Sequence, residues 1–252
     1  MRTRLWIVIT LLAALAAASP CPAQNPAHAH QFLAAMQAYK AGRYAEAAKA
    51  LEAIAADGVR NGQLYYDLGN AYLKDDDLGR AILWYERALR LLPNDPDLRF
   101  NYEYARSLAK DAQDESTSPL VRILFFWNYQ LSARTILWLA LTFNLIFWAL
   151  AVARRLTRRR ALRHAATAAL LPALLFVFTA GYNYYAAAHQ RLAIVLPAEI
   201  AVRSGLEPTS TELFQLHAGA KVQVVKALQG HLQIQFSQDK IGWVESTAVG
   251  RI

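Results

Sequence analysis

The chain has 252 residues, 55% of them hydrophobic, and its formal net charge is +8 at pH 7. A chain this basic can bind nucleic acid, but here the excess consists of arginines in or beside apolar stretches, and the remaining segments are nearly neutral. This distribution argues against a nucleic-acid surface and indicates a membrane-orientation signal. The ten arginines are Arg2, Arg4, Arg122, Arg134, Arg154, Arg155, Arg158, Arg159, Arg160 and Arg163.

Residues 1–23 predict a secretory signal peptide. Two arginines precede an apolar stretch from Leu5 to Ala18, which small residues and prolines follow. Cleavage after Ala23 and cleavage after Ala18 both fit, and an uncleaved signal anchor is the alternative. Cleavage after Ala23 removes Cys21, the only cysteine, so the mature chain would form no disulfide.

Residues 62–95 resemble a tetratricopeptide repeat in eight positions counted from Gly62 as the first of 34. Large apolar, small, aromatic and alanine positions recur in that family's register, and a proline closes the second helix. Small residues at two of these positions let the paired helices approach closely. The matching residues are Tyr65, Leu68, Gly69, Tyr72, Ala81, Tyr85, Ala88 and Pro93.

Residues 28–61 fit a second, looser copy of the repeat, and residues 97–112 predict a single capping helix. The predicted all-α domain therefore covers residues 28–112. Repeats of this kind bury their apolar faces only by stacking, and about three are usually needed. With two repeats and a cap, we expect self-association or docking onto the membrane.

The first helices of such repeats form a concave face, which predicts a groove for a partner protein. Asparagine and lysine side chains on this face can hold a peptide backbone or a terminal carboxylate. The alternative is that these side chains only pack within the domain. The candidate groove residues are Tyr39, Lys40, Tyr66, Asn70, Lys74, Asn101 and Tyr104, with Phe32, Met36, Leu73 and Phe100 beside them.

Two apolar runs, 133–153 and 165–185, predict membrane spans. Each has about 20 residues, which at 1.5 Å per residue cross a hydrocarbon core roughly 30 Å thick. Residues 119–132 predict a helix along the membrane interface before the first span. The loop 154–164 carries six of the arginines, which indicates that it is cytoplasmic and that both flanking domains face the other side. Within the first span, Asn144 is expected to hydrogen-bond a neighbouring helix.

Residues 191–252 alternate apolar and polar side chains between glycines, which predicts a small, curved antiparallel sheet. The order of its segments resembles a bacterial SH3 domain, most clearly at Lys240–Val244, where Gly242 is expected in a turn. Trp243 is expected in the core. Together the segments predict a multi-domain membrane protein: all-α tetratricopeptide hairpins, a two-helix transmembrane hairpin and a small all-β SH3-like barrel.

Motifs for catalysis are not recognisable in the sequence. There is no glycine-rich phosphate loop, no His/Cys set with metal-ligand spacing and no nucleophile elbow. Asp75, Asp76 and Asp77 follow each other at the turn between two repeat helices, where a solvated acidic turn is the expected structure. We therefore expect a protein that is not an enzyme and that uses no cofactor or metal.

The order of segments resembles the Bat family of aerotolerance-operon proteins, specifically its repeat-containing E member. That resemblance implies a bacterial inner-membrane protein with periplasmic N- and C-terminal domains. It also implies membrane-anchored von Willebrand A-domain partners in envelope or oxidative stress tolerance, for which this chain would be a scaffold. A cell-wall tether that binds peptidoglycan through the SH3-like domain is the alternative, and an assembly chaperone for envelope proteins is a third possibility.

Overall fold

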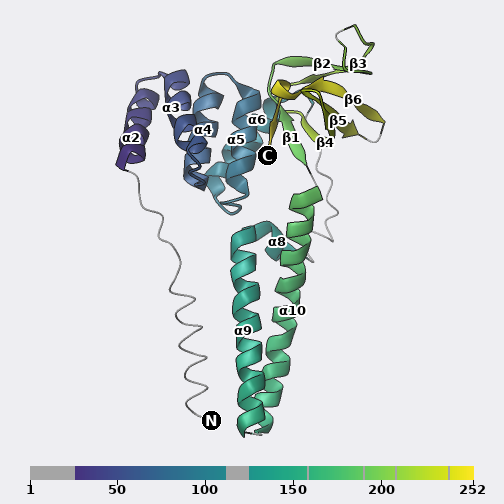
Figure 1. The fold of residues 1–252 in the computed structure, drawn as a ribbon. Helices are drawn as coiled ribbons and strands as arrows, with labels where there is room; N and C mark the ends of the chain where they lie inside the picture. The colour runs from purple at the N-terminus through teal and green to yellow at the C-terminus, as the bar shows by residue number, and fades with distance from the viewer. Residues whose placement is uncertain (1–25, 112–124, 158, 190, 208, 238) are drawn as a thin grey trace.

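A computed structural model describes residues 26–111, 125–157, 159–189, 191–207, 209–237 and 239–252. The predicted signal peptide and the first part of the predicted interfacial helix lie outside these residues. The described chain forms a helical repeat region, a long helical hairpin and an antiparallel sheet (Figure 1).

Five helices make up the repeat region, two antiparallel pairs and a cap. Side-chain caps fix where three of them begin. The Asn61 carboxamide oxygen accepts from the backbone amides of Gln63 (2.8 Å) and Leu64, and Asp77 and Asp95 cap the next two helices in the same way. These caps set the repeat boundaries near those that the sequence predicts. The helices are α2 (Pro26–Lys40), α3 (Tyr44–Ala56), α4 (Gly62–Lys74), α5 (Leu78–Leu89) and α6 (Pro96–Leu108).

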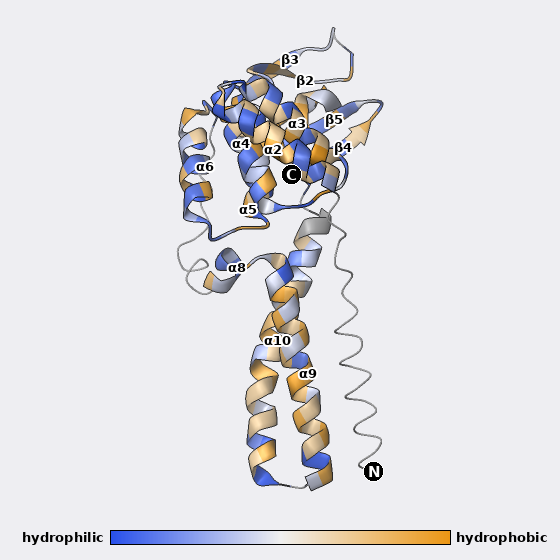
Figure 2. Ribbon diagram, turned by 90° about the vertical axis from the view of Figure 1, so that its left-hand side faces the viewer, coloured by the Kyte–Doolittle hydropathy of each residue, from blue (hydrophilic) through white to orange (hydrophobic). Residues whose placement is uncertain are grey.

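The hairpin consists of α9 (Ala133–Thr157) and α10 (Arg160–His189), preceded by the short helix α8 (Phe126–Gln130). Both long helices are long and apolar enough to cross a membrane, and Figure 2 shows that hydrophobic residues predominate along them. They extend beyond the predicted spans. They continue into the predicted loop 154–164, so that Arg154, Arg155, Arg160 and Arg163 lie on helix ends.

Polar contacts hold α8 against the upper half of α10. The indole Nε1 of Trp127 donates to the Thr179 hydroxyl at 3.3 Å, and the Asn183 amide donates to the Asn128 carbonyl oxygen at 2.9 Å. Asn144, in contrast, is exposed and makes no hydrogen bond to any described residue. Its predicted bond to a neighbouring helix is absent between α9 and α10, because Asn144 lies on a face of α9 that α10 does not cover.

The C-terminal region is a seven-stranded antiparallel sheet in the order β3-β2-β6-β5-β4-β1-β7. Gln229 and Gly230, both with positive φ, form the two-residue turn between β4 and β5. Gly242 lies inside a strand rather than in a turn, because it packs against the Val202 side chain and the Arg203 backbone. The strands are β1 (Leu192–Val195), β2 (Glu199–Arg203), β3 (Glu212–His217), β4 (Lys221–Leu228), β5 (His231–Ser237), β6 (Lys240–Glu245) and β7 (Val249–Arg251).

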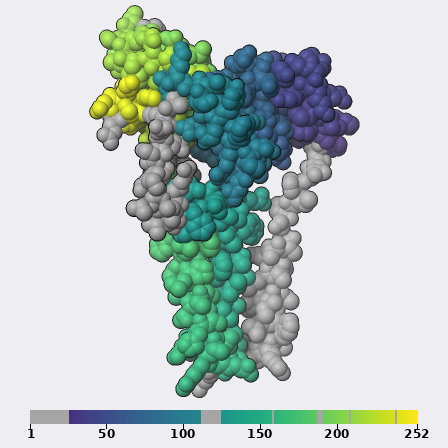
Figure 3. Space-filling model, turned by 180° about the vertical axis from the view of Figure 1, so that it is seen from behind, coloured from purple at the N-terminus to yellow at the C-terminus, as the bar shows by residue number. Residues whose placement is uncertain are grey.

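The sheet packs against the repeats, at the end of the hairpin away from its tip (Figure 3). Ile194 of β1 is fully buried and belongs to the helical core rather than to the core of the sheet. At Gly79 of α5 an added Cβ would lie 2.7 Å from the Leu196 Cα, so the chain approaches the helix too closely for any side chain at this position. The repeats and the sheet therefore form one packed unit.

Candidate protein-interaction surface

The inner face of the repeats, formed by α2, α4 and α6, carries a hydrogen-bonded polar cluster. We define this cluster as Tyr66, Asn70, Tyr85 and Asn101. The Asn70 carbonyl oxygen accepts from the Tyr85 hydroxyl at 2.7 Å and from the Asn101 amide at 2.9 Å. The Asn101 amide also donates to the Tyr66 hydroxyl at 2.9 Å. Three helices, α4, α5 and α6, are thus joined by polar side chains.

These hydrogen bonds leave binding capacity at the surface. The hydroxyl proton of Tyr66 and the carbonyl oxygen of Asn101 take no part in them, so the cluster can still donate and accept. Tyr66, Asn70 and Asn101 are half-buried, whereas Tyr85 is fully buried beneath them. A half-buried layer of paired donors and acceptors matches the alternating N–H and C=O groups of an extended peptide.

Asp67 is a further residue of this face, which the repeat pattern does not identify. Burial raises its pKa, and the Gln63 amide donates to it at 3.3 Å. Burial raises the pKa of both Tyr39 and Tyr66, and the Asn70 side chain partly offsets this at Tyr66. Asp67 is among the charges that raise the pKa of both tyrosines, so its carboxylate lies near these two rings. A half-buried aspartate without a basic partner among the hydrogen bonds and ion pairs of the described residues favours a cationic ligand.

The other predicted groove residues lie around the cluster. Tyr39 is half-buried, and its ring meets that of Tyr44 edge-on at 5.2 Å. Lys40 and Lys74 are exposed at the last residues of α2 and α4, and Tyr104 is exposed on α6. The structure therefore joins Tyr66, Asn70 and Asn101 directly and leaves the remaining predicted residues at the edge of the face.

The outer face of α5 is closed by the sheet. Glu86 of α5 accepts from the Tyr102 hydroxyl of α6 at 2.5 Å and from the Lys221 ammonium of β4 at 3.0 Å. Arg87 donates to the carbonyl oxygen of Arg251 at 2.6 Å, and Arg90 donates to that of Ile252. Asp111 accepts from both the backbone amide and the ring of His217. These charged contacts surround an apolar centre at Ile82 and Leu83.

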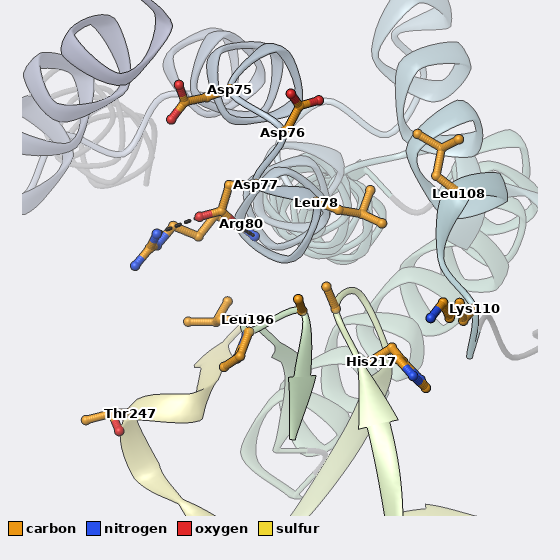
Figure 4. A pocket seen from close by; sticks show the side chains of 13 residues that line it. Asp75, Asp76, Asp77, Leu78, Arg80, Leu108, Lys110, Leu196, His217 and Thr247 are labelled. Atoms are coloured by element: carbon orange, nitrogen blue, oxygen red, sulfur yellow. Dashed lines mark hydrogen bonds and ion pairs between the residues drawn. The ribbon is translucent and has the colours of Figure 1, made fainter. Parts of the chain in front are cut away.

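A hollow of about 630 Å³ lies at the edge of this joint (Figure 4). Asp75, Asp76 and Asp77 line one side, and Leu196, His217 and Thr247 of the sheet line the other. Asp77 is used locally, because it caps α5 and pairs with Arg80. Within the described ranges no group of three or more metal-ligating side chains is placed to hold an ion.

A smaller hollow, of about 410 Å³, opens on the sheet beside Trp243. Trp243 is half-buried, so the expectation of a core tryptophan is only partly met. Arg203, Glu207 and His231 line the same hollow and give it both charges. A tryptophan with polar neighbours is a surface on which a sugar or a peptide can stack.

Comparison with known proteins identifies the helical region. Residues 32–96 match the tetratricopeptide repeat family, a range that covers α3, α4, α5 and most of α2. No curated protein matches the chain. The chain thus contains a tetratricopeptide repeat region together with two long apolar helices and a C-terminal antiparallel sheet, and the repeats indicate a role in protein–protein interaction.

Proposed function

We propose that the chain is a non-catalytic membrane adaptor whose repeats bind an extended segment of a partner protein on their inner face. The observation that carries this proposal is the polar cluster, which presents half-buried donors and acceptors on a rigid helical surface. Interaction residues are most effective when their own hydrogen bonds hold them in place before the ligand arrives. Asp67 beside the cluster adds a preference for a basic side chain in the bound segment.

The hairpin places this surface near a bilayer. In the proposed arrangement α9 and α10 span a bacterial inner membrane, the arginine-rich tip is cytoplasmic, and the repeats and the sheet face the periplasm. Trp127 and Tyr129 of α8 fit the headgroup region, where amphipathic rings are favoured. Partners would then be envelope proteins, and the Bat resemblance favours membrane-anchored proteins with von Willebrand A-domains in stress tolerance. The sheet, which we take to be SH3-like, adds a contact next to the repeats.

Site-specific photo-crosslinking in intact membranes tests the inner face. A crosslinker at Lys74, beside the polar cluster, is expected to join one small and constant set of proteins. The matched control is a crosslinker at Lys49, an exposed residue of α3, which is not one of the helices that form the inner face. Equal products from both positions would contradict the proposal.

Substitution of the cluster sharpens the same test. Replacing Tyr66 by Phe, Asn70 by Ala and Asn101 by Ala removes the polar groups of its three half-buried residues and leaves the buried Tyr85 hydroxyl without its acceptor. We expect the Lys74 crosslinks to disappear and the melting temperature to fall, because three hydrogen bonds of about 1 kcal/mol each are lost, and circular dichroism checks that the variant is still folded at the temperature of the crosslinking. Crosslinks that persist in a folded triple variant would remove the cluster from the binding site.

The hollow beside Trp243 favours a second candidate, a cell-wall tether that binds peptidoglycan. The full chain in detergent would then be retained on purified wall material, and Trp243→Ala would release it. The full chain is used because the sheet packs against α5. Retention without any constant protein crosslink at Lys74 would favour the tether over the adaptor.

A further inference from the structure

The tip of the hairpin contains a hollow lined almost entirely by arginine. Its size is about 650 Å³, within the range of small-ligand sites. The last turns of α9 and the first turn of α10 supply most of the lining, so two helix ends hold the guanidinium groups around one space. The lining residues are Ala151, Arg154, Arg155, Arg159, Arg160 and Arg163.

Among the residues that the structure describes, these arginines form no ion pair with an acidic side chain. The sequence contains no aspartate or glutamate between Glu115 and Glu199. Figure 1 places the tip at the end of the hairpin remote from the repeats and the sheet, which carry the acidic residues of the described chain. In the repeats, by contrast, Arg43 is paired with Glu46 and Arg80 with Asp77. Five like charges around one hollow repel each other unless an external anion occupies it.

The residue type points to phosphate. Lysine occurs in the repeats and in the sheet, but at no position between Lys110 and Lys221. A membrane-orientation signal is satisfied equally by lysine and arginine. Guanidinium differs in offering two parallel N–H donors that fit the two free oxygens of a phosphodiester. It is also more weakly hydrated than an ammonium group, so its desolvation on binding costs less free energy. The first turn of α10 adds backbone N–H groups and the positive end of its dipole on the same side.

We infer that the tip binds the phosphate groups of anionic phospholipids. The hollow lies where two helices of membrane-spanning length end, which is the depth of the headgroup phosphates. Five guanidinium groups exceed the charge of one phosphodiester, so the tip gathers several phosphates around the hairpin. This inference rests on the proposed membrane placement and is independent of the binding surface on the repeats.

Retained lipid measures this binding directly. The full chain is reconstituted in phosphatidylcholine mixed with phosphatidylglycerol, re-extracted in detergent, and its bound phospholipids are quantified. The test variant changes all five lining arginines to lysine, which keeps the charge and the orientation signal. The control variant, Arg134→Lys with Arg191→Lys, makes the same change at the other end of the hairpin.

We expect the native chain and the control to retain phosphatidylglycerol in excess over the surrounding mixture, and the tip variant to retain the two lipids in the proportion of the mixture. Equal enrichment in the tip variant would overturn the site, because charge alone would then explain it. Enrichment that inorganic phosphate abolishes would assign the tip to a soluble anion instead of a lipid. Partner crosslinking at Lys74 should be unchanged in the tip variant, so a failure here is distinct from a failure of the adaptor proposal.

Discussion

The two faces of the repeat region are built differently. The outer face of α5 is apolar at its centre, with Ile82 and Leu83 buried, and charged pairs surround it. The inner face presents tyrosine and asparagine side chains whose hydrogen bonds are internal but incomplete. The outer face is therefore an interface already occupied by the sheet, and the inner face is the one left for a partner.

The spacing along α5 explains why the sheet binds there. One stripe of α5, at helical intervals of three and four, faces the sheet, and Tyr85 on another face reaches the polar cluster. The stripe consists of Gly79, Ile82, Leu83, Glu86, Arg87 and Arg90. Because α5 contacts the sheet and the polar cluster through different residues, substitutions on α5 can disturb the joint with the sheet without changing the cluster.

The largest loss of stability is expected from adding a side chain at Gly79, where α5 and the chain after β1 are in close contact. In Gly79→Ala the new Cβ would overlap backbone atoms of Val195 and Leu196, which cannot rotate away. Overpacking of this kind costs about 1–3 kcal/mol or more, well above the gain of about 1 kcal/mol in helix propensity. Thermal unfolding should show the loss, and limited proteolysis should show earlier cleavage of the sheet.

Gly181→Ala in α10 is the matched control, because a Cβ at that position has no neighbour within 4 Å. This variant should unfold at the same temperature as the native chain or slightly above it. Equal melting temperatures for the two alanine variants would show that the sheet is not packed tightly on α5.

A smaller effect is expected from the charged part of the joint. The side chains of Glu86 and Lys221 are 12% and 26% exposed, so their ion pair is only partly screened by water. In a double-mutant cycle with Glu86→Gln and Lys221→Met, we expect a coupling energy of about 1–2 kcal/mol. Chemical unfolding of the four proteins measures it. A coupling energy near zero would leave apolar packing alone to hold the sheet.

Local patterns in the sequence were sufficient for most of the architecture. Repeat spacing placed the helix pairs, and the positions of Asn61, Asp77 and Asp95 explain their starts. Apolar length predicted both hairpin helices, although their ends differ because an arginine on a helix end can extend into water without breaking the helix. Glycine alone was a poor guide within the sheet, since Gly242 serves close packing rather than a turn.

The joint between repeats and sheet was not predicted, because it connects residues more than 100 positions apart, such as Glu86 and Lys221. One local signal was present. Ile82 and Leu83 are large apolar residues on a face that the repeat does not need to bury, which indicates a second packing partner for α5. Asp67 was missed for a related reason, since its burial depends on how α2 and α4 meet.

The smallest change in stability is expected from substituting Asp67 on the inner face. Unlike the changes at the joint, it should depend on pH. Burial raises the pKa of this carboxyl, so the folded state binds its proton more tightly than the unfolded state. The charged form thus lowers stability above the folded pKa, and this penalty disappears as the pH falls to the unfolded value, about 3.9. Asp67→Asn should therefore be slightly more stable than the native chain at neutral pH, and the difference should vanish below that value. Unfolding curves across this pH range test the expectation.

If Asp67 also holds a basic side chain of the partner, the same substitution should reduce crosslinking at Lys74 at neutral pH. A variant that is less stable at neutral pH would instead mean that the charge on Asp67 is compensated within the fold, and the inner face would then lose its preference for a cationic ligand.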